Sequence, residues 1–97
     1  MPIFLLFGTY TNEALQGISA ERTKKAVKLI EAYNGEVKSM YAVLGEHDLV
    51  FTVIFPDAEK AVTASLALRK LTGISFTTSP VVDVEEFDKL AGKVKDM

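Results

Sequence analysis

The sequence predicts one α+β domain in which two helices cover one face of a four-stranded antiparallel sheet. Two stretches, 3–7 and 48–55, are apolar at both odd and even positions, as is typical of strands that are covered on both faces. Around them, segments of strand and helical periodicity follow in the order strand, helix, strand, strand, helix, strand, helix. We therefore expect the two apolar stretches to be the central strands of the sheet.

The first half of the chain supplies a strand, a helix and a second strand. A polar connector follows the strand at 3–10, and Ser19 is expected to cap the helix after it, because its hydroxyl can accept an amide of the first turn. That helix is expected to end at Asn34 and Gly35, since either residue can adopt the left-handed conformation of a C-terminal cap. The strand at 36–44 alternates weakly and carries polar side chains, which indicates an edge position.

The second half of the chain begins with a tight turn at 45–47, which joins two strands as a hairpin. Pro56 stops the second of these strands. Asp57 is then the expected N-cap of a helix whose many small residues permit close packing on a sheet. The strand at 74–82 contains Pro80, which cannot donate to a ladder, so this strand is expected to lie at an edge or to be bulged there.

This element order gives the ferredoxin-like βαββαβ sandwich, with sheet order 4-1-3-2, when each crossover is right-handed. Two helices shield only one face of such a sheet. The last helix, which a capping-box pattern at 83–86 opens, could cover part of the other face, and a second copy of the sheet would cover all of it. We therefore expect a homodimer or a larger homo-oligomer, with four residues of the central strands at its interface: Phe4, Leu6, Val50 and Ile54.

Composition excludes several classes of function. The 97 residues are enough for one domain, spanning 1–97. The formal net charge of −2, with lysines spread among acids, leaves no footprint for nucleic acid or an anionic membrane. Without cysteine there are no disulfides, iron–sulfur clusters or cysteine-bound zinc. No apolar run approaches the ~20 residues of a membrane helix, and no signal-peptide pattern opens the chain. We expect a cytoplasmic protein without a cofactor.

The turn and the strand after it also resemble a known family. Residues 44–50 are Leu-Gly-Glu-His-Asp-Leu-Val and are followed by Pro56 and Asp57. This pattern is similar to the signature of the GYD domain family, named for a Gly-Tyr-Asp-like motif that opens the third strand. Similar features elsewhere extend the resemblance over nearly the whole chain: Met1-Pro2, Thr11, Gly17 and the spacing Ser19-x-x-Arg22.

The resemblance implies a ferredoxin-like fold of the dimeric α/β barrel kind and an uncharacterised function. Gly45 and Asp48 match the family motif position by position. His47, however, stands where the family usually has tyrosine. A role that depends on that phenol therefore does not carry over to this chain.

Five residues are candidates for a small-molecule site: Tyr10, Tyr41, His47, Asp48 and Thr52. His47 could be a proton shuttle or a metal ligand, but adjacent strand residues point to opposite faces, so a half-exposed turn residue is the favoured interpretation. Asp48 could be a general base, although a turn-forming aspartate is favoured. Tyr10 and Tyr41 could reach a common pocket with Thr52. Tyrosines at strand ends are equally typical of interfaces, and the interface interpretation is favoured.

Three hypotheses for function follow. The favoured one is a non-catalytic homo-oligomer that binds a small ligand or a protein partner, because no catalytic constellation is present in the sequence. The alternative is a cofactor-free or metal-assisted enzyme, similar to monooxygenases or isomerases of this fold, which would need His47 or Asp48 to face a cavity. The third is a regulatory domain, which could act only on another chain because no DNA-binding segment is present. Arg22, near a helix N-terminus, could help to bind an anion, but a solvated side chain is favoured.

Overall fold

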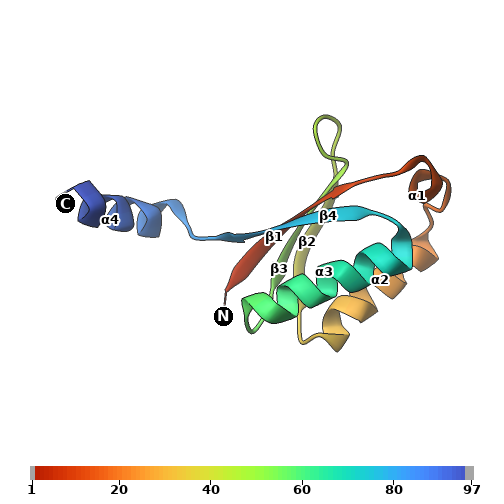
Figure 1. Ribbon diagram of the computed structural model, residues 1–97, viewed down its shortest axis with the longest axis horizontal. Helices are drawn as coiled ribbons and strands as arrows, with labels where there is room; N and C mark the ends of the chain where they lie inside the picture. The colour runs from red at the N-terminus through yellow and green to blue at the C-terminus, as the bar shows by residue number, and fades with distance from the viewer. Residues whose placement is uncertain (1, 96–97) are drawn as a thin grey trace.

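Four strands form one antiparallel sheet in the computed structural model, which describes residues 2–95 (Figure 1). The strands are β1 (Ile3–Thr9), β2 (Glu36–Ala42), β3 (Leu49–Ile54) and β4 (Ser75–Val81). Their order across the sheet is β2-β3-β1-β4, which is the predicted order 4-1-3-2 counted from the other edge. The predicted ferredoxin-like α+β fold is confirmed, with β1 and β3 in the middle.

Four helices accompany the strands within the described residues: α1 (Asn12–Gln16), α2 (Ala20–Ala32), α3 (Ala58–Thr72) and α4 (Val84–Lys95). The capping residues act as the sequence predicts. Ser19 Oγ accepts from the backbone of Arg22 at 3.0 Å, and Asp57 Oδ1 accepts from that of Lys60 at 2.8 Å. Asn34 follows α2 with a φ of 64°, the left-handed conformation that ends a helix. No helix of the described residues is long and apolar enough to cross a membrane.

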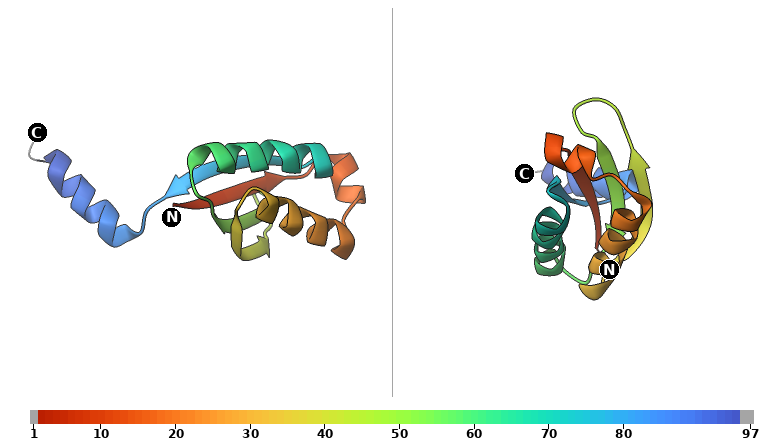
Figure 2. Two further views of the ribbon diagram at one scale, coloured as in Figure 1. Left: turned by 90° about the horizontal axis from the view of Figure 1, so that it is seen from below. Right: turned by 90° about the vertical axis from the view of Figure 1, so that its right-hand side faces the viewer.

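The hydrophobic core lies between the sheet and the paired helices α2 and α3, which cover the same face (Figure 2). β1 contributes Phe4 and Leu6 to it, and Phe55, directly after β3, packs edge-on against Phe4 with ring centroids 5.9 Å apart. The small residues Ala61 and Ala64 of α3 are fully buried. They let this helix approach the sheet closely, as the sequence predicts.

No other element of the described chain covers the opposite face of the sheet, here called the open face. Side chains alternate along a strand, so the residues between the core positions point to this side. The register pairs Ile3 with Ile54 and Phe7 with Val50, which brings their side chains to one surface. The apolar residues of the open face are Ile3, Leu5, Phe7, Val50, Ile54 and Val81.

The predicted interface has to be corrected, because it combines the two faces. Phe4 and Leu6 lie in the core under the helices, and Leu6 has no exposed surface. Val50 and Ile54 lie on the open face and are partly exposed. The four residues therefore do not form one surface. A strand that is apolar at every position does not reveal from its sequence which alternate set faces the helices.

The last helix, α4, projects beyond the end of the sheet (Figures 1 and 2). None of its residues is buried, and the protein is correspondingly elongated, with extents of 51 × 29 × 18 Å. The expectation that this helix could cover part of the second sheet face of its own chain is not met. Its apolar side is left without a partner in the described part of the chain.

Candidate ligand-binding site

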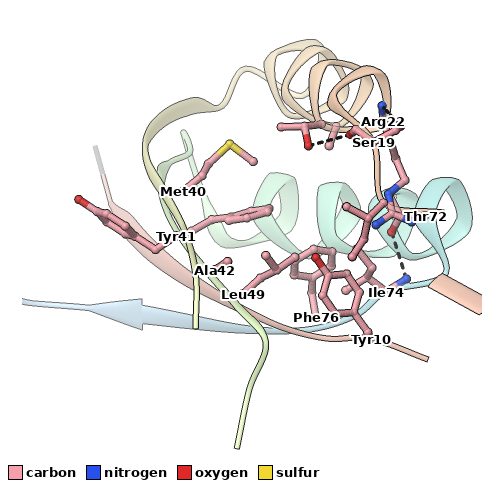
Figure 3. Close-up of a pocket in the computed structure, with 14 residues that line it drawn as sticks. Tyr10, Ser19, Arg22, Met40, Tyr41, Ala42, Leu49, Thr72, Ile74 and Phe76 are labelled. Atoms are coloured by element: carbon pink, nitrogen blue, oxygen red, sulfur yellow. Dashed lines mark hydrogen bonds between the residues drawn. The ribbon is translucent and has the colours of Figure 1, made fainter. Parts of the chain in front are cut away.

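A cavity of about 180 Å³ lies at one end of the sheet, beside the first turn of α2 (Figure 3). This is the end at which β1 and β2 finish and β3 and β4 begin. Apolar side chains of the sheet line it on one side, among them Leu49, Phe51 and Phe76. Polar groups reach it from the connector and from α2, and they include the side chains of Tyr10 and Arg22.

The apolar lining depends on a glycine in the neighbouring strand. Gly8 of β1 pairs with Phe76 of β4, and a Cβ added at Gly8 would lie 2.8 Å from Phe76 Cε1. The absence of that Cβ lets the Phe76 ring lie over β1 and contact Phe51, with ring centroids 5.4 Å apart.

Arg22 is the charged group of the cavity, and three neighbours hold it in place. Its Nη1 donates to the carbonyl oxygen of Ala14 at 2.6 Å, and its guanidinium carbon lies 5.9 Å from the centroid of the Tyr10 ring, within the range of a cation–π contact. A Cβ added at Gly17 would lie 2.8 Å from Nη1. The side chain is half-buried, so the favoured expectation of a solvated arginine is not met.

The guanidinium has no carboxylate partner in the part of the chain that the structure describes. The ion pairs within residues 2–95 join Lys25 to Glu21 and Lys38 to Glu36, and both lie on the surface. Arginine carries five N–H donors, and the acceptor recorded for Arg22 is one backbone oxygen. The site therefore combines an apolar wall with a positioned guanidinium that has further N–H groups available to a ligand.

Of the three residues predicted to share a pocket, Tyr10 and Tyr41 line the cavity and Thr52 does not. The ring of Tyr10 points into the cavity, whereas that of Tyr41 points away from it (Figure 3), and Tyr41 is 64% exposed. Thr52 pairs with Leu5 on the open face, on the other side of the sheet. The correction for Thr52 has the same origin as that of the interface, because the parity of each strand position decides its face.

Asp48 is a structural residue at the rim of the hairpin. Its Oδ2 accepts from the backbone N–H of Tyr10 at 2.9 Å, and its own backbone N–H donates to Gly8 at 2.8 Å. The favoured interpretation, an aspartate that bonds to backbone amides, describes this arrangement. This amide is that of Tyr10, just after β1, and not one of the turn. Asp48 therefore links the hairpin to Tyr10.

His47 lies against the open face. Its ring is tilted by 32° over that of Phe7, with centroids 4.9 Å apart, and Nδ1 is 3.5 Å from Thr9 Oγ1. Neither His47 nor Asp48 lines the cavity. Within residues 2–95, no group of three or more histidine, cysteine, aspartate or glutamate side chains is placed to hold a metal ion. At this cavity, the condition that the enzyme hypothesis requires of His47 or Asp48 is not met.

Comparison with known families identifies the chain. The family model of the GYD domain matches residues 4–91. The chain belongs to the GYD domain family. Comparison with curated proteins gives no match.

Solved structures share the fold of this GYD domain. One is the leucine response regulatory protein of Mycobacterium tuberculosis, which is 17% identical with a TM-score of 0.57; the match covers 86% of this chain and 51% of that one. Two further matches are solved structures of mutant proteins. They have TM-scores of 0.57 and 0.56 at 15% and 17% identity. They cover 87% and 86% of this chain and 52% and 51% of theirs. The GYD domain therefore spans about half the length of these structures, and the likeness shows the fold alone.

Proposed function

We propose that this GYD domain is a non-catalytic, homo-oligomeric module that binds a small molecule with a carboxylate group and a compact apolar part. The observation that carries the proposal is Arg22, a half-buried cation without a carboxylate partner in residues 2–95, at an apolar cavity. A charge that is partly removed from water is stabilised by a counter-charge. Arginine presents paired N–H groups whose geometry matches a carboxylate.

The size of the cavity limits the ligand. A water molecule occupies about 30 Å³ in the liquid, so the cavity of about 180 Å³ has the volume of about six waters. Sites for drug-sized ligands are typically about 300–1,000 Å³. Arg22 is the one cationic side chain among the lining residues, which favours a singly charged carboxylate over a phosphate. A short aliphatic or single-ring carboxylate fits these limits.

The homo-oligomeric part of the proposal rests on the open face. An apolar surface that extends over the central strands is seldom left in water by a soluble protein. A second copy can supply an apolar surface that covers it, and a two-fold axis would make the covering mutual. Native mass spectrometry of freshly purified protein measures the number of subunits and any retained small molecule in one experiment.

Titration calorimetry tests the ligand class with isovalerate, benzoate and their neutral amides. We expect at least one carboxylate to bind at least tenfold more tightly than its amide, because a charge-assisted hydrogen bond contributes about 1.5–3 kcal/mol and about 1.4 kcal/mol is tenfold in affinity. Arg22→Met should remove this preference. Arg69→Met alters an exposed arginine of α3 and should retain it. Equal affinity for acid and amide in the unaltered protein would contradict the proposed ligand class.

A further inference from the structure

The helix α4 has an apolar side that runs its whole length and is exposed. The residues of this side recur at helical spacing, and their exposed fractions lie between 41% and 75%. They are Val84, Phe87, Leu90 and Val94. The other side carries the charged residues, among them Glu85 and Lys89. An isolated helix of fewer than about 12–15 residues is marginal in water and owes most of its stability to packing of such a side. A helix of 12 residues with this pattern requires a packing partner.

The body of its own chain does not supply that partner. Only Val82 and Asp83 separate the end of β4 from the start of α4. Asp83 is engaged as the cap of the helix, since its Oδ1 accepts from the backbone of Glu86 at 2.8 Å and its carbonyl oxygen accepts from that of Phe87 at 2.9 Å. The chain continues through these two residues away from the sheet (Figures 1 and 2). Docking on its own open face would require the chain to reverse direction between strand and cap.

We propose that α4 packs its apolar side on the open face of a second copy, so that two chains exchange their C-terminal helices. The proposal rests on the homo-oligomer proposed above and names the segment that joins the copies. Each chain then covers the other's uncovered apolar sheet with its own uncovered apolar helix. A two-fold axis satisfies all four surfaces at once.

The dimensions of the two surfaces agree. Four strands spaced by about 4.8 Å give a face about 19 Å wide, and seven residues of strand span about 23 Å. A helix of 12 residues is about 18 Å long and about 10 Å across. One helix therefore matches the face in length and covers roughly half of its width, and the rest of the face remains for the body of the partner.

The charges of α4 favour a second copy over a lipid surface. Helices that lie on anionic membranes typically carry lysine and arginine on the polar side. The polar side of α4 instead carries three acidic residues (Glu85, Glu86 and Asp88) and three lysines (Lys89, Lys93 and Lys95). This balance gives no net attraction to anionic lipid.

Cross-linking between a tagged and an untagged chain tests the exchange, and the absence of native cysteine makes each introduced thiol unique. A chain with Leu90→Cys is refolded together with an untagged chain with Thr52→Cys, whose residue lies at the centre of the open face, and a short bis-maleimide is added. We expect a mixed covalent dimer, identified by its mass. The matched control replaces Leu90→Cys by Lys89→Cys, which moves the thiol to the polar side of α4 and should give several-fold less product.

Three outcomes would overturn the exchange. The first is equal yield from the two positions of α4, and the second is no mixed product from Leu90→Cys. The third is a dimer of unchanged dissociation constant in Leu90→Glu, a variant that leaves the buried core intact because no residue of α4 is buried. In each case a dimeric unaltered protein would leave the homo-oligomer standing. An unaltered chain that is monomeric at every concentration would instead refute the homo-oligomer itself, and the exchange with it.

Discussion

At the scale of single residues, the family motif has a structural explanation. Gly45 opens the turn with a φ of 145°, in the region that favours glycine. Asp48 bonds to the backbone of Tyr10, so its carboxylate fixes the segment that leads from β1 toward the cavity. His47 packs on Phe7 instead of entering the cavity. The contacts of the motif thus link the hairpin to β1 and to the segment that leads toward the cavity.

Replacing the motif aspartate should therefore lower stability. We expect Asp48→Ala to reduce the free energy of unfolding by about 1–3 kcal/mol, because a hydrogen bond to a charged group is lost and the amide of Tyr10 is left without its acceptor. Asp48→Asn retains one oxygen acceptor and should cost less. Urea denaturation measures both, with Glu46→Ala at an exposed neighbour as the control. An Asp48→Ala protein as stable as the control would contradict this role.

The sequence could predict the structural role of Asp48 but not the position of Arg22. Aspartate in a turn is a local preference, and it depends on nearby backbone. The environment of Arg22 depends on α1, which buries the guanidinium against the carbonyl oxygen of Ala14. A short polar connector gives little periodic signal, so its path over Arg22 follows only from the tertiary structure.

At the scale of elements, two glycines lie in opposite environments, one closely packed and one on an open surface. Gly8 lies under Phe76, and Gly92 in α4 has nothing within 4 Å of an added Cβ. Gly8→Ala should destabilise the protein by about 1–3 kcal/mol, because the added methyl group overpacks a buried contact. It should also shift Phe76 into the cavity and weaken carboxylate binding.

Gly92→Ala is the matched control for Gly8→Ala. It should not lower the unfolding midpoint, and it should raise helicity slightly, since alanine is favoured over glycine in a helix by about 0.5–1 kcal/mol. Thermal unfolding and circular dichroism measure the two variants under the same conditions. A Gly8→Ala protein of unaltered stability would show that β1 and β4 do not depend on that close approach.

The order and type of the main elements follow from local signals. The caps at Ser19 and Asp57 and the helix end at Asn34 mark boundaries that the structure reproduces to within a few residues. The proline in β4 indicates an edge strand, and β4 lies at an edge of the sheet. The faces of the central strands were not predictable in the same way. Both alternate sets in β1 and β3 are apolar, so hydrophobicity does not identify the set under the helices.

At the scale of the whole molecule, two apolar surfaces are left uncovered by the described chain. They are the open face of the sheet and the exposed side of α4. Covering the open face and the apolar side of α4 together requires another molecule, either a second copy or a protein of matching shape. The proposed exchange accounts for the two surfaces together. It leaves the cavity accessible in each subunit, because the cavity lies where β4 begins and α4 follows the end of β4.

Two aspartate substitutions separate the core from the proposed interface. Val50→Asp lies on the open face and should fold but dissociate the assembly, because a carboxylate buried without a partner in the interface is strongly destabilising. Leu6→Asp replaces a residue with no exposed surface and should prevent folding. Circular dichroism reports folding, and size-exclusion chromatography reports the assembly. A folded Val50→Asp protein that elutes with the unaltered one would remove Val50 from the interface.

Sedimentation equilibrium of the unaltered protein over a wide range of concentration tests the central claim most directly, which is that a second copy covers the open face. We predict a species with twice the mass of the 10.6 kDa chain, or a higher multiple of it. This species should dissociate only at the low end of the concentration range. A single species of the chain mass at the highest concentration would contradict the claim.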